Sequence, residues 1–290
     1  ACMSSGYSWI EDMNGPNVDD MGVGPYPCNN ALGIRLSSSG AYLSQARHRL
    51  NLTIRANCTV QKILLEKKTA IGVELVSGEE KFTAYGKKIL LSSGTLSNPH
   101  ILMLSGIGPG AHVEDMGIEL VHDLPGVGQN LKDHPMANLL FSIKDMSIVD
   151  INAPRSQIFL KYNSSEGNYS SDMRINGAMA IPESSWDYGG RRIGGKEVDE
   201  VSISMTAVIM LATSKGEVRL KSSNPEEYPE INLNLLSTES DMVRMVEAVR
   251  KANELSKEPA FRHIIDHRIK PTDLEFESDE AIRSWLPEVV

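Results

Sequence analysis

The sequence predicts a mixed α/β fold of the α+β kind, in which strand-rich and helical stretches follow one another. The apolar run at residues 88–92 leads through a Ser-Gly turn into a short helix, a pattern typical of a strand in a parallel sheet. Longer strand-like segments begin after residue 135, and a long amphipathic helix begins after Thr238. The change of pattern near residue 135 predicts a domain boundary there.

The composition is that of an ordinary globular chain. Hydrophobic residues make up 41% of the 290 residues and charged residues 23%, which allows a sizeable core. No run of about 18 apolar residues predicts a membrane span. The net charge of -9 comes without a basic patch, so nucleic acid is not an expected partner.

The cysteines argue against both a disulfide framework and a metal site. Cys2, Cys28 and Cys58 are odd in number and widely spaced, without a Cys-x-x-Cys pair, and we expect no metal. The first residues lack a basic region followed by an apolar stretch, so no signal peptide is recognised. The compartment therefore stays open, with the cytoplasm favoured.

The first part of the chain divides into a turn-rich segment and a strand-rich block. Residues 1–40 contain many Gly and Pro residues and predict an extended excursion with turns, of a length that usually serves function. A Ser77-Gly78 hairpin turn joins two of the strands that follow. The expected strands are residues 51–57, 60–66, 70–76 and 81–85.

Two short helices are expected after the Ser93-Gly94 turn. Ser97 offers an N-cap oxygen, Pro99 is tolerated in a first turn, and His100–Leu104 continue the first helix. The second helix covers residues 111–116, with Gly117 as a left-handed cap and a strand at residues 118–121 behind it.

The remainder of the chain is expected to form long strands and two further helices. A helix around residues 157–162 is expected among the strands. Thr238 begins the amphipathic helix that Pro259 ends, and Ser278 caps a last helix at residues 279–286. The expected strands are residues 136–143, 174–181, 201–211 and 216–221.

The strand, glycine turn and helix at residues 88–104 form the pattern with most functional content. A glycine after a buried strand lets main chain approach a ligand, and a helix N-terminus favours negative charge. On local pattern alone, a plain structural turn remains the alternative.

A longer match decides between these readings. The run from Ser92 to Pro109, Ser-Ser-Gly-Thr-Leu-Ser-Asn-Pro-His-Ile-Leu-Met-Leu-Ser-Gly-Ile-Gly-Pro, resembles the second signature of the glucose-methanol-choline (GMC) oxidoreductases, with Asn98-Pro99 in place of the usual Ser-Pro. Further family landmarks are similar to segments in the correct order along nearly the whole chain. These segments are residues 12–16, 35–43, 51–53, 72–74, 124–135 and 216–225.

The resemblance implies FAD as cofactor and names its contacts. The family strand that corresponds to residues 57–60 touches the adenine ring through main chain, which assigns that contact to Val60; its side chain is otherwise an ordinary core residue. Ser93 and Gly94 match residues close to the ribose and pyrophosphate. The implied domains are an entrance segment (residues 1–40), part of an FAD-binding domain (41–134), an antiparallel-sheet substrate domain (135–236) and returning C-terminal helices (237–290).

The implied activity is oxidation of an alcohol or choline-like small molecule at its CH-OH group, with hydride passing to flavin N5 and the electron acceptor left open. No catalytic residue is expected in this chain. His134 is not expected to act as a base, because it directly follows Asp133 and adjacent strand residues point to opposite faces. The resemblance gives the Asp133-His134 pair a structural role. The resemblance also implies that the catalytic histidine of the family lies beyond the helix at residues 279–286.

The family's Gly-x-Gly-x-x-Gly loop is also missing. The glycines at residues 22–27 and 126–131 both fail at the third position. We therefore expect a fragment, with the true N-terminus missing and the isolated chain inactive. A lyase that cleaves cyanohydrins without net redox change, and a non-catalytic remnant or half of a split enzyme, remain as alternatives.

Overall fold

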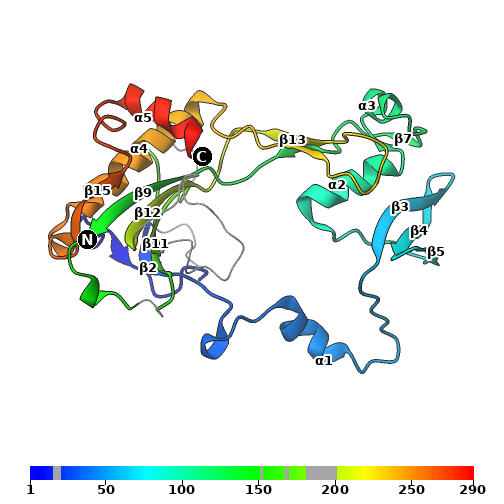
Figure 1. The fold of residues 1–290 in the computed structure, drawn as a ribbon, viewed down its shortest axis with the longest axis horizontal. Helices are drawn as coiled ribbons and strands as arrows, with labels where there is room; N and C mark the ends of the chain where they lie inside the picture. Colours follow the sequence, from blue (N-terminus) through cyan, green and yellow to red (C-terminus); the bar gives the residue numbers. More distant parts are fainter. Residues whose placement is uncertain (16–20, 151–152, 167–169, 181–200) are drawn as a thin grey trace. The chain divides into compact units, whose positions relative to one another are not determined.

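The computed structural model describes residues 1–15, 21–150, 153–166, 170–180 and 201–290 (Figure 1). The chain divides into two compact units. The expected boundary near residue 135 lies close to a division after Lys132. Unit 1 comprises Ala1–Cys28, Asp133–Ser214 and Leu235–Val290, and unit 2 comprises Asn29–Lys132 and Lys215–Asn234.

Unit 1 is built on a seven-stranded sheet in the order β1-β2-β10-β11-β12-β9-β15. β1 and β2 are parallel, and the other pairs are antiparallel. β2 comes from the turn-rich segment, so residues 22–25 are sheet. The bounds are β1 (Ser8–Trp9), β2 (Gly22–Pro25), β9 (Met136–Ile143), β10 (Ser156–Tyr162), β11 (Met173–Ala180), β12 (Ser202–Ile209) and β15 (Ile265–Lys270).

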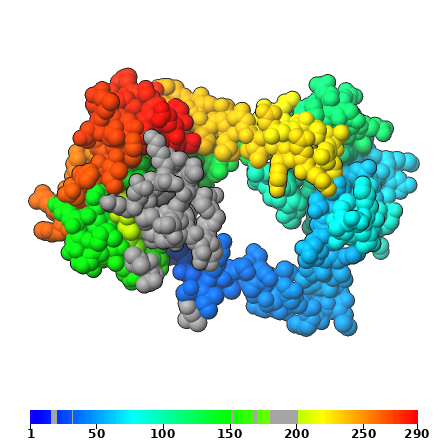
Figure 2. Space-filling view, in the orientation of Figure 1, coloured from blue at the N-terminus to red at the C-terminus, as the bar shows by residue number. Residues whose placement is uncertain are grey.

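One face of this sheet packs on α4 (Glu239–Ser256). Alternate residues of the strands, such as Met173 and Ala207, are fully buried against Met245 and its neighbours. Thr238 caps α4 by accepting a bond from the Asp241 N-H at 3.3 Å, and Ser278 caps α5 (Asp279–Trp285), both as predicted. The chain from α4 to the C-terminus, orange to red, forms a continuous surface of this unit (Figure 2).

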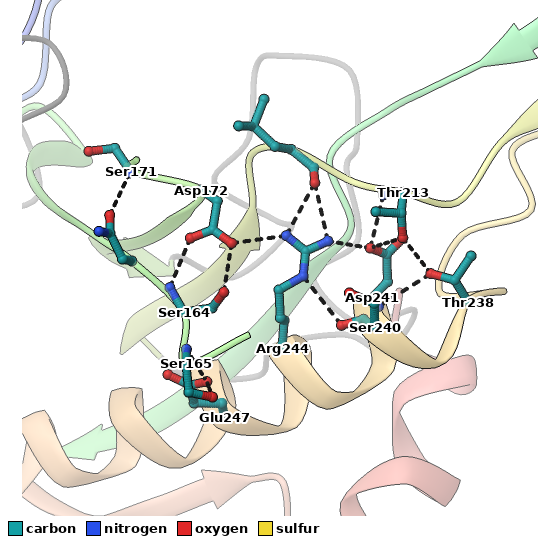
Figure 3. A network of polar contacts seen from close by, with 12 residues as sticks. Ser164, Ser165, Ser171, Asp172, Thr213, Thr238, Ser240, Asp241, Arg244 and Glu247 are labelled. Carbon is teal, nitrogen blue, oxygen red and sulfur yellow. Dashed lines mark hydrogen bonds and ion pairs between the residues drawn. The ribbon is translucent and has the colours of Figure 1, made fainter. Parts of the chain in front are cut away.

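A buried ion network fixes α4 to the sheet (Figure 3). The Arg244 guanidinium lies between Asp172 and Asp241, with Nη1 3.0 Å from Asp172 Oδ2, and it donates to the Leu211 carbonyl oxygen at 3.1 Å. Burial would raise the pKa of Asp241, but the hydrogen bonds it accepts outweigh burial and hold that pKa at about 2. Ser164 donates further hydrogen bonds to the Asp172 carboxylate, and Thr213 and Ser214 donate to that of Asp241.

Unit 2 contains small antiparallel sheets and short helices. One sheet has the order β3-β4-β5, with the predicted hairpin turn at Gly78, and a second has the order β14-β13-β8. The bounds are α1 (Ser44–Ala46), β3 (Thr59–Glu66), β4 (Thr69–Ser77), β5 (Glu80–Tyr85), α2 (Gly94–Leu104), β6 (Ile107–Gly108), α3 (Gly110–Asp115), β7 (His122–Asp123), β8 (Gln129–Leu131), β13 (Gly216–Arg219) and β14 (Glu230–Asn232).

The helix expected around residues 157–162 is wrong, because this segment is β10. It pairs with β11 on one side and β2 on the other. Leu160 and Tyr162 are 1% exposed on the core face, while Phe159 and Lys161 lie on the opposite face. Pairing on both sides therefore overrides the local preference.

Three expected strands are also absent from the described structure. Residues 51–57 and 88–92 pair with no other segment, and residues 118–121 precede the two-residue β7. Leu90, expected to be covered on both faces, is 84% exposed. A strand requires a hydrogen-bonded neighbour, and none of the described residues supplies one to this run. The expected cap is also displaced, since α2 begins at Gly94 and not after Ser97.

Candidate functional site

The turn before α2 keeps the open main chain that the sequence indicated. Gly94 has φ +91°, and a Cβ built there would meet no atom within 4 Å. The Ser93 N-H donates to Asn98 Oδ1 at 2.8 Å, so the Asn of the Asn-Pro pair holds the turn in place. That role of Asn98 was not predicted. The residues from Ser92 to Ser97 are exposed, which leaves room for a ligand beside a helix N-terminus.

Val60 lies on β3, which is packed against α2. The Ile63 N-H donates to Ser105 Oγ at 2.8 Å, and this hydroxyl donates in turn to the Ile101 carbonyl oxygen at 2.6 Å. The β3-β4 register shifts just after Val60, where Gln61 is 9% exposed and its Nε2 has no partner. The structure thus joins the two elements that carry the three predicted cofactor residues. Their contact with FAD stays a prediction.

The rejected glycine pairs occupy ordinary structural positions. Gly22 and Gly24 lie within β2, and a Cβ on either would overlap main chain of Ser8 or Ile10. Gly126 and Gly128 lie in the turn before β8. Neither pair opens a helix, as cradling a pyrophosphate would require.

Two histidines illustrate the structural role expected of this residue type. The Nε2 of His112 accepts the Leu220 N-H at 3.0 Å, and burial followed by the Arg219 charge lowers the His112 pKa. His134 is exposed, and its N-H donates to Asp133 Oδ1 at 2.8 Å. The Asp133-His134 pair therefore makes a local main-chain contact, which gives no indication of a base.

A polar face on the sheet of unit 1 was missed. We use "the polar face" for the side of β9 to β12 opposite α4. The sheet register places Asn176, Thr206 and Asn138 in one row across three strands. Thr206 Oγ1 donates to Asn138 Oδ1 at 2.6 Å, and Ser204 Oγ lies 3.4 Å from the same oxygen. The alternation of Ser and Thr with apolar residues along residues 202–207 is the signal that could have found it.

Two buried polar atoms on this face have no partner. The Arg174 guanidinium carbon lies 4.4 Å from the centre of the Tyr26 ring and 4.0 Å from that of Phe159, and Nε donates to Asn176 Oδ1. Its Nη2 is buried and unpaired, as is the Oγ of Ser202. Buried polar atoms are nearly always hydrogen-bonded, so these two are places where a bound molecule can supply the missing partner.

Metal and membrane sites receive no support from the described residues. No group of three or more His, Cys, Asp or Glu side chains in the described ranges is arranged to hold a metal ion, and the three cysteines are free. In the same ranges, no helix is both long and apolar enough to cross a bilayer.

Several solved structures share the fold of this chain. Pyridoxine 4-oxidase from Mesorbium loti matches with a TM-score of 0.86 at 21% identity, over 99% of this chain and 55% of that one. Formate oxidase matches with a TM-score of 0.81 at 20% identity, over 99% and 57%. FAD is named for an Aspergillus oryzae formate oxidase and for an oxidoreductase from Chaetomium thermophilum with TM-scores of 0.83 and 0.80. The expected mixed α/β fold is therefore confirmed.

Sequence profiles described as GMC oxidoreductase match residues 1–136 and 212–285. The chain belongs to the GMC oxidoreductase family, as the signature at residues 92–109 indicated. An oxygen-dependent choline dehydrogenase from Photobacterium profundum is 30% identical over 99% of this chain and 52% of its own length. One from Pseudomonas fluorescens is 31% identical over 99% and 53%. The chain thus spans about half the length of these curated relatives.

Replacing Gly94 with valine is expected to weaken FAD retention roughly 10-fold or more in the product of the full open reading frame that contains this chain. The described protein would not crowd the new side chain, but a β-branched residue at φ +91° is strained and would move the turn. Flavin content of the purified protein measures the effect. Gly126→Val, at a position with equal space and no positive φ, is the control. Unchanged flavin content in Gly94→Val would remove Gly94 from the site.

Proposed function

We propose that this chain binds FAD and takes part in the oxidation of a small-molecule alcohol at its CH-OH group. Bound FAD supplies the hydride acceptor for this chemistry. The chain's own residues have two tasks in the proposal, which are to hold the nucleotide and to orient the alcohol. Choline-like alcohols enter as candidate substrates through the relatives' names, and the electron acceptor is left open.

The open turn at Gly94 is the observation that carries the proposal. A dinucleotide presents ribose hydroxyls and phosphate oxygens, which main-chain N-H groups at a helix N-terminus bind well. Ser93 and Gly94 are exposed, and the empty space at the Gly94 Cβ position lets a ligand approach the main chain. The residues present therefore fit the nucleotide part of FAD.

The polar face of unit 1 supports the substrate side of the proposal. Its row of amide and hydroxyl groups, with Asn138 and Thr206 at the centre, can orient a hydroxyl by hydrogen bonds. The opposite face is filled mainly by apolar side chains packed against α4. No described residue is assigned as the base that removes the hydroxyl proton.

The proposal predicts that alcohols bleach the visible flavin band of the FAD-loaded product of the full open reading frame under anaerobic conditions. Bound FAD would supply the acceptor for the hydride that leaves the carbinol carbon, and the hydroxyl proton would pass to solvent as the carbonyl product forms. A panel of anionic, neutral and cationic alcohols should include at least one that bleaches the band. Flavin that binds but stays oxidised with every alcohol would refute the redox proposal, and cyanohydrin cleavage by the same sample would favour the lyase alternative.

A further inference from the structure

Among the described residues, the guanidinium of Arg174 stacks on two aromatic rings, those of Phe159 on the polar face and of Tyr26 just after β2. The rings of Tyr26 and Phe159 lie edge to face, with centres 5.4 Å apart, and both hold the guanidinium within 4.4 Å of their centres. Stacking leaves the in-plane N-H donors free for other partners. Nε is used by Asn176, whereas Nη2 is buried and unpaired.

Among the described residues, no acidic side chain of the polar face balances the charge of Arg174. None of the described side chains on the polar face is acidic. They are Met136, Asn138, Leu140, Ser142, Ser156, Phe159, Lys161, Arg174, Asn176, Ala178, Ser202, Ser204, Thr206 and Val208. Lys161 lies on the same face and is 6% exposed.

We infer that Arg174 selects the substrate of the proposed reaction, and that this substrate is an alcohol that carries a carboxylate. The inference rests on the proposed function. A carboxylate would accept the unused donor of the guanidinium in a charge-assisted hydrogen bond, the geometry for which Arg is suited. It would also neutralise a positive charge in a poorly solvated place.

The same arrangement disfavours a quaternary ammonium alcohol such as choline. Trimethylammonium groups bind over the faces of aromatic rings, and here the rings of Tyr26 and Phe159 already hold Arg174. A second cation about 6 Å from the guanidinium would lose roughly 100-fold in affinity at an effective dielectric constant of about 20. The substrate of this chain therefore differs in charge from the choline named for its relatives.

The first test measures binding on the 290-residue chain itself. The Arg174 Nε-Hε resonance in an ¹⁵N spectrum is assigned by its loss in Arg174→Lys. Titration with 3-hydroxypropanoate at constant ionic strength is expected to shift it saturably, and choline is expected to leave it unchanged. The inference fails if choline causes an equal shift, or if neither compound shifts the resonance, since a buried water would then be the partner of Nη2.

The second test compares three alcohols of similar shape on the FAD-loaded full open reading frame product. These are 3-hydroxypropanoate, choline and 3,3-dimethylbutan-1-ol, which is the neutral analogue of choline. We expect flavin reduction to fall in the order anion, neutral, cation. Arg174→Gln should lower kcat/KM for the anion roughly 10- to 100-fold and spare the neutral alcohol.

Arg250→Gln is the matched control, because Arg250 also stacks on an aromatic ring, 4.7 Å from the centre of Phe276, but lies outside the polar face. It should keep the wild-type order. Choline as the best substrate, or equal effects of Arg174→Gln on all three alcohols, would overturn the inference. A flavin that none of the three reduces would instead remove the proposed function, and the resonance titration would still decide whether Arg174 binds carboxylates.

Discussion

Replacing Arg244 with methionine is expected to lower the free energy of unfolding of unit 1 by about 3–5 kcal/mol. Asp172 and Asp241 are both 0% exposed, and without the guanidinium they would be two buried carboxylates facing each other. Methionine keeps much of the packing volume, so the loss reports charge and hydrogen bonding. Urea unfolding followed by tryptophan fluorescence measures it, because Trp285 is 4% exposed in the same core.

A surface pair provides the control for this variant. Arg283 contacts Glu239 at 2.6 Å, but the two side chains are 33% and 72% exposed, so Arg283→Met should cost only about 0–1 kcal/mol. The folded-state pKa of Asp241 is depressed to about 2, so its contribution is complete above pH about 4 and is lost as pH falls towards 2. The gap between wild type and Arg244→Met should therefore narrow in that window. Equal stabilities of the two proteins at neutral pH would refute the role of the network.

Replacing Gly128 with alanine is expected to destabilise unit 2 by about 2–4 kcal/mol. Gly128 has φ +80°, where an L-residue is strained, and the added Cβ would overlap the Val218 carbonyl oxygen. The Gly128 carbonyl oxygen also accepts the Val218 N-H at 2.7 Å, so the substitution acts on the link between this turn and β13. Hydrogen exchange at Val218 and its neighbours should accelerate in proportion.

Gly126, in the same turn, provides the control that separates the effect of backbone strain at Gly128 from that of any glycine-to-alanine change in this turn. A Cβ at Gly126 would meet nothing within 4 Å and its φ is not positive, so Gly126→Ala should change stability by less than about 0.5 kcal/mol. Residues 29–132 and 215–234 of unit 2 include no tryptophan, which is why unit 2 is followed by hydrogen exchange and not by fluorescence. If the Val218 N-H were equally protected from hydrogen exchange in Gly128→Ala and Gly126→Ala, the conformation of Gly128 would make no contribution to stability.

The elements that sequence predicted well are those whose signals are local. The caps at Thr238 and Ser278 depend on one hydroxyl and an N-H three residues later, and the alternation along residues 136–143 needs only the strand itself. The prediction for residues 157–162 failed because Ile158 and Phe159 stand four and three residues before Tyr162, as on one helix face, while Leu160 and Tyr162 alternate as in a strand. The segment is a strand because it forms main-chain hydrogen bonds with β11, the next strand along the chain, and with β2, which is far away in sequence.

The candidate site also has one part that the sequence indicated and one part that it did not. The resemblance assigned cofactor contacts to Ser93, Gly94 and Val60, which stay predictions, and the structure packs the elements that carry them against each other through Ser105. The polar face escaped prediction because its members come from four different strands, and no single strand shows that Arg174 Nη2 lacks a partner. Only the register across β10, β11 and β12 brings these side chains to one surface.

By itself the sequence determined the family, through an ordered series of short matches, and the helix ends, through caps that act within four residues. The tertiary structure decided which apolar runs became strands, which carboxylates surround Arg244, and that no described side chain of the polar face is acidic. The physical reason is that main-chain pairing and buried charge are settled between distant residues, so their outcome depends on partners that no local pattern contains.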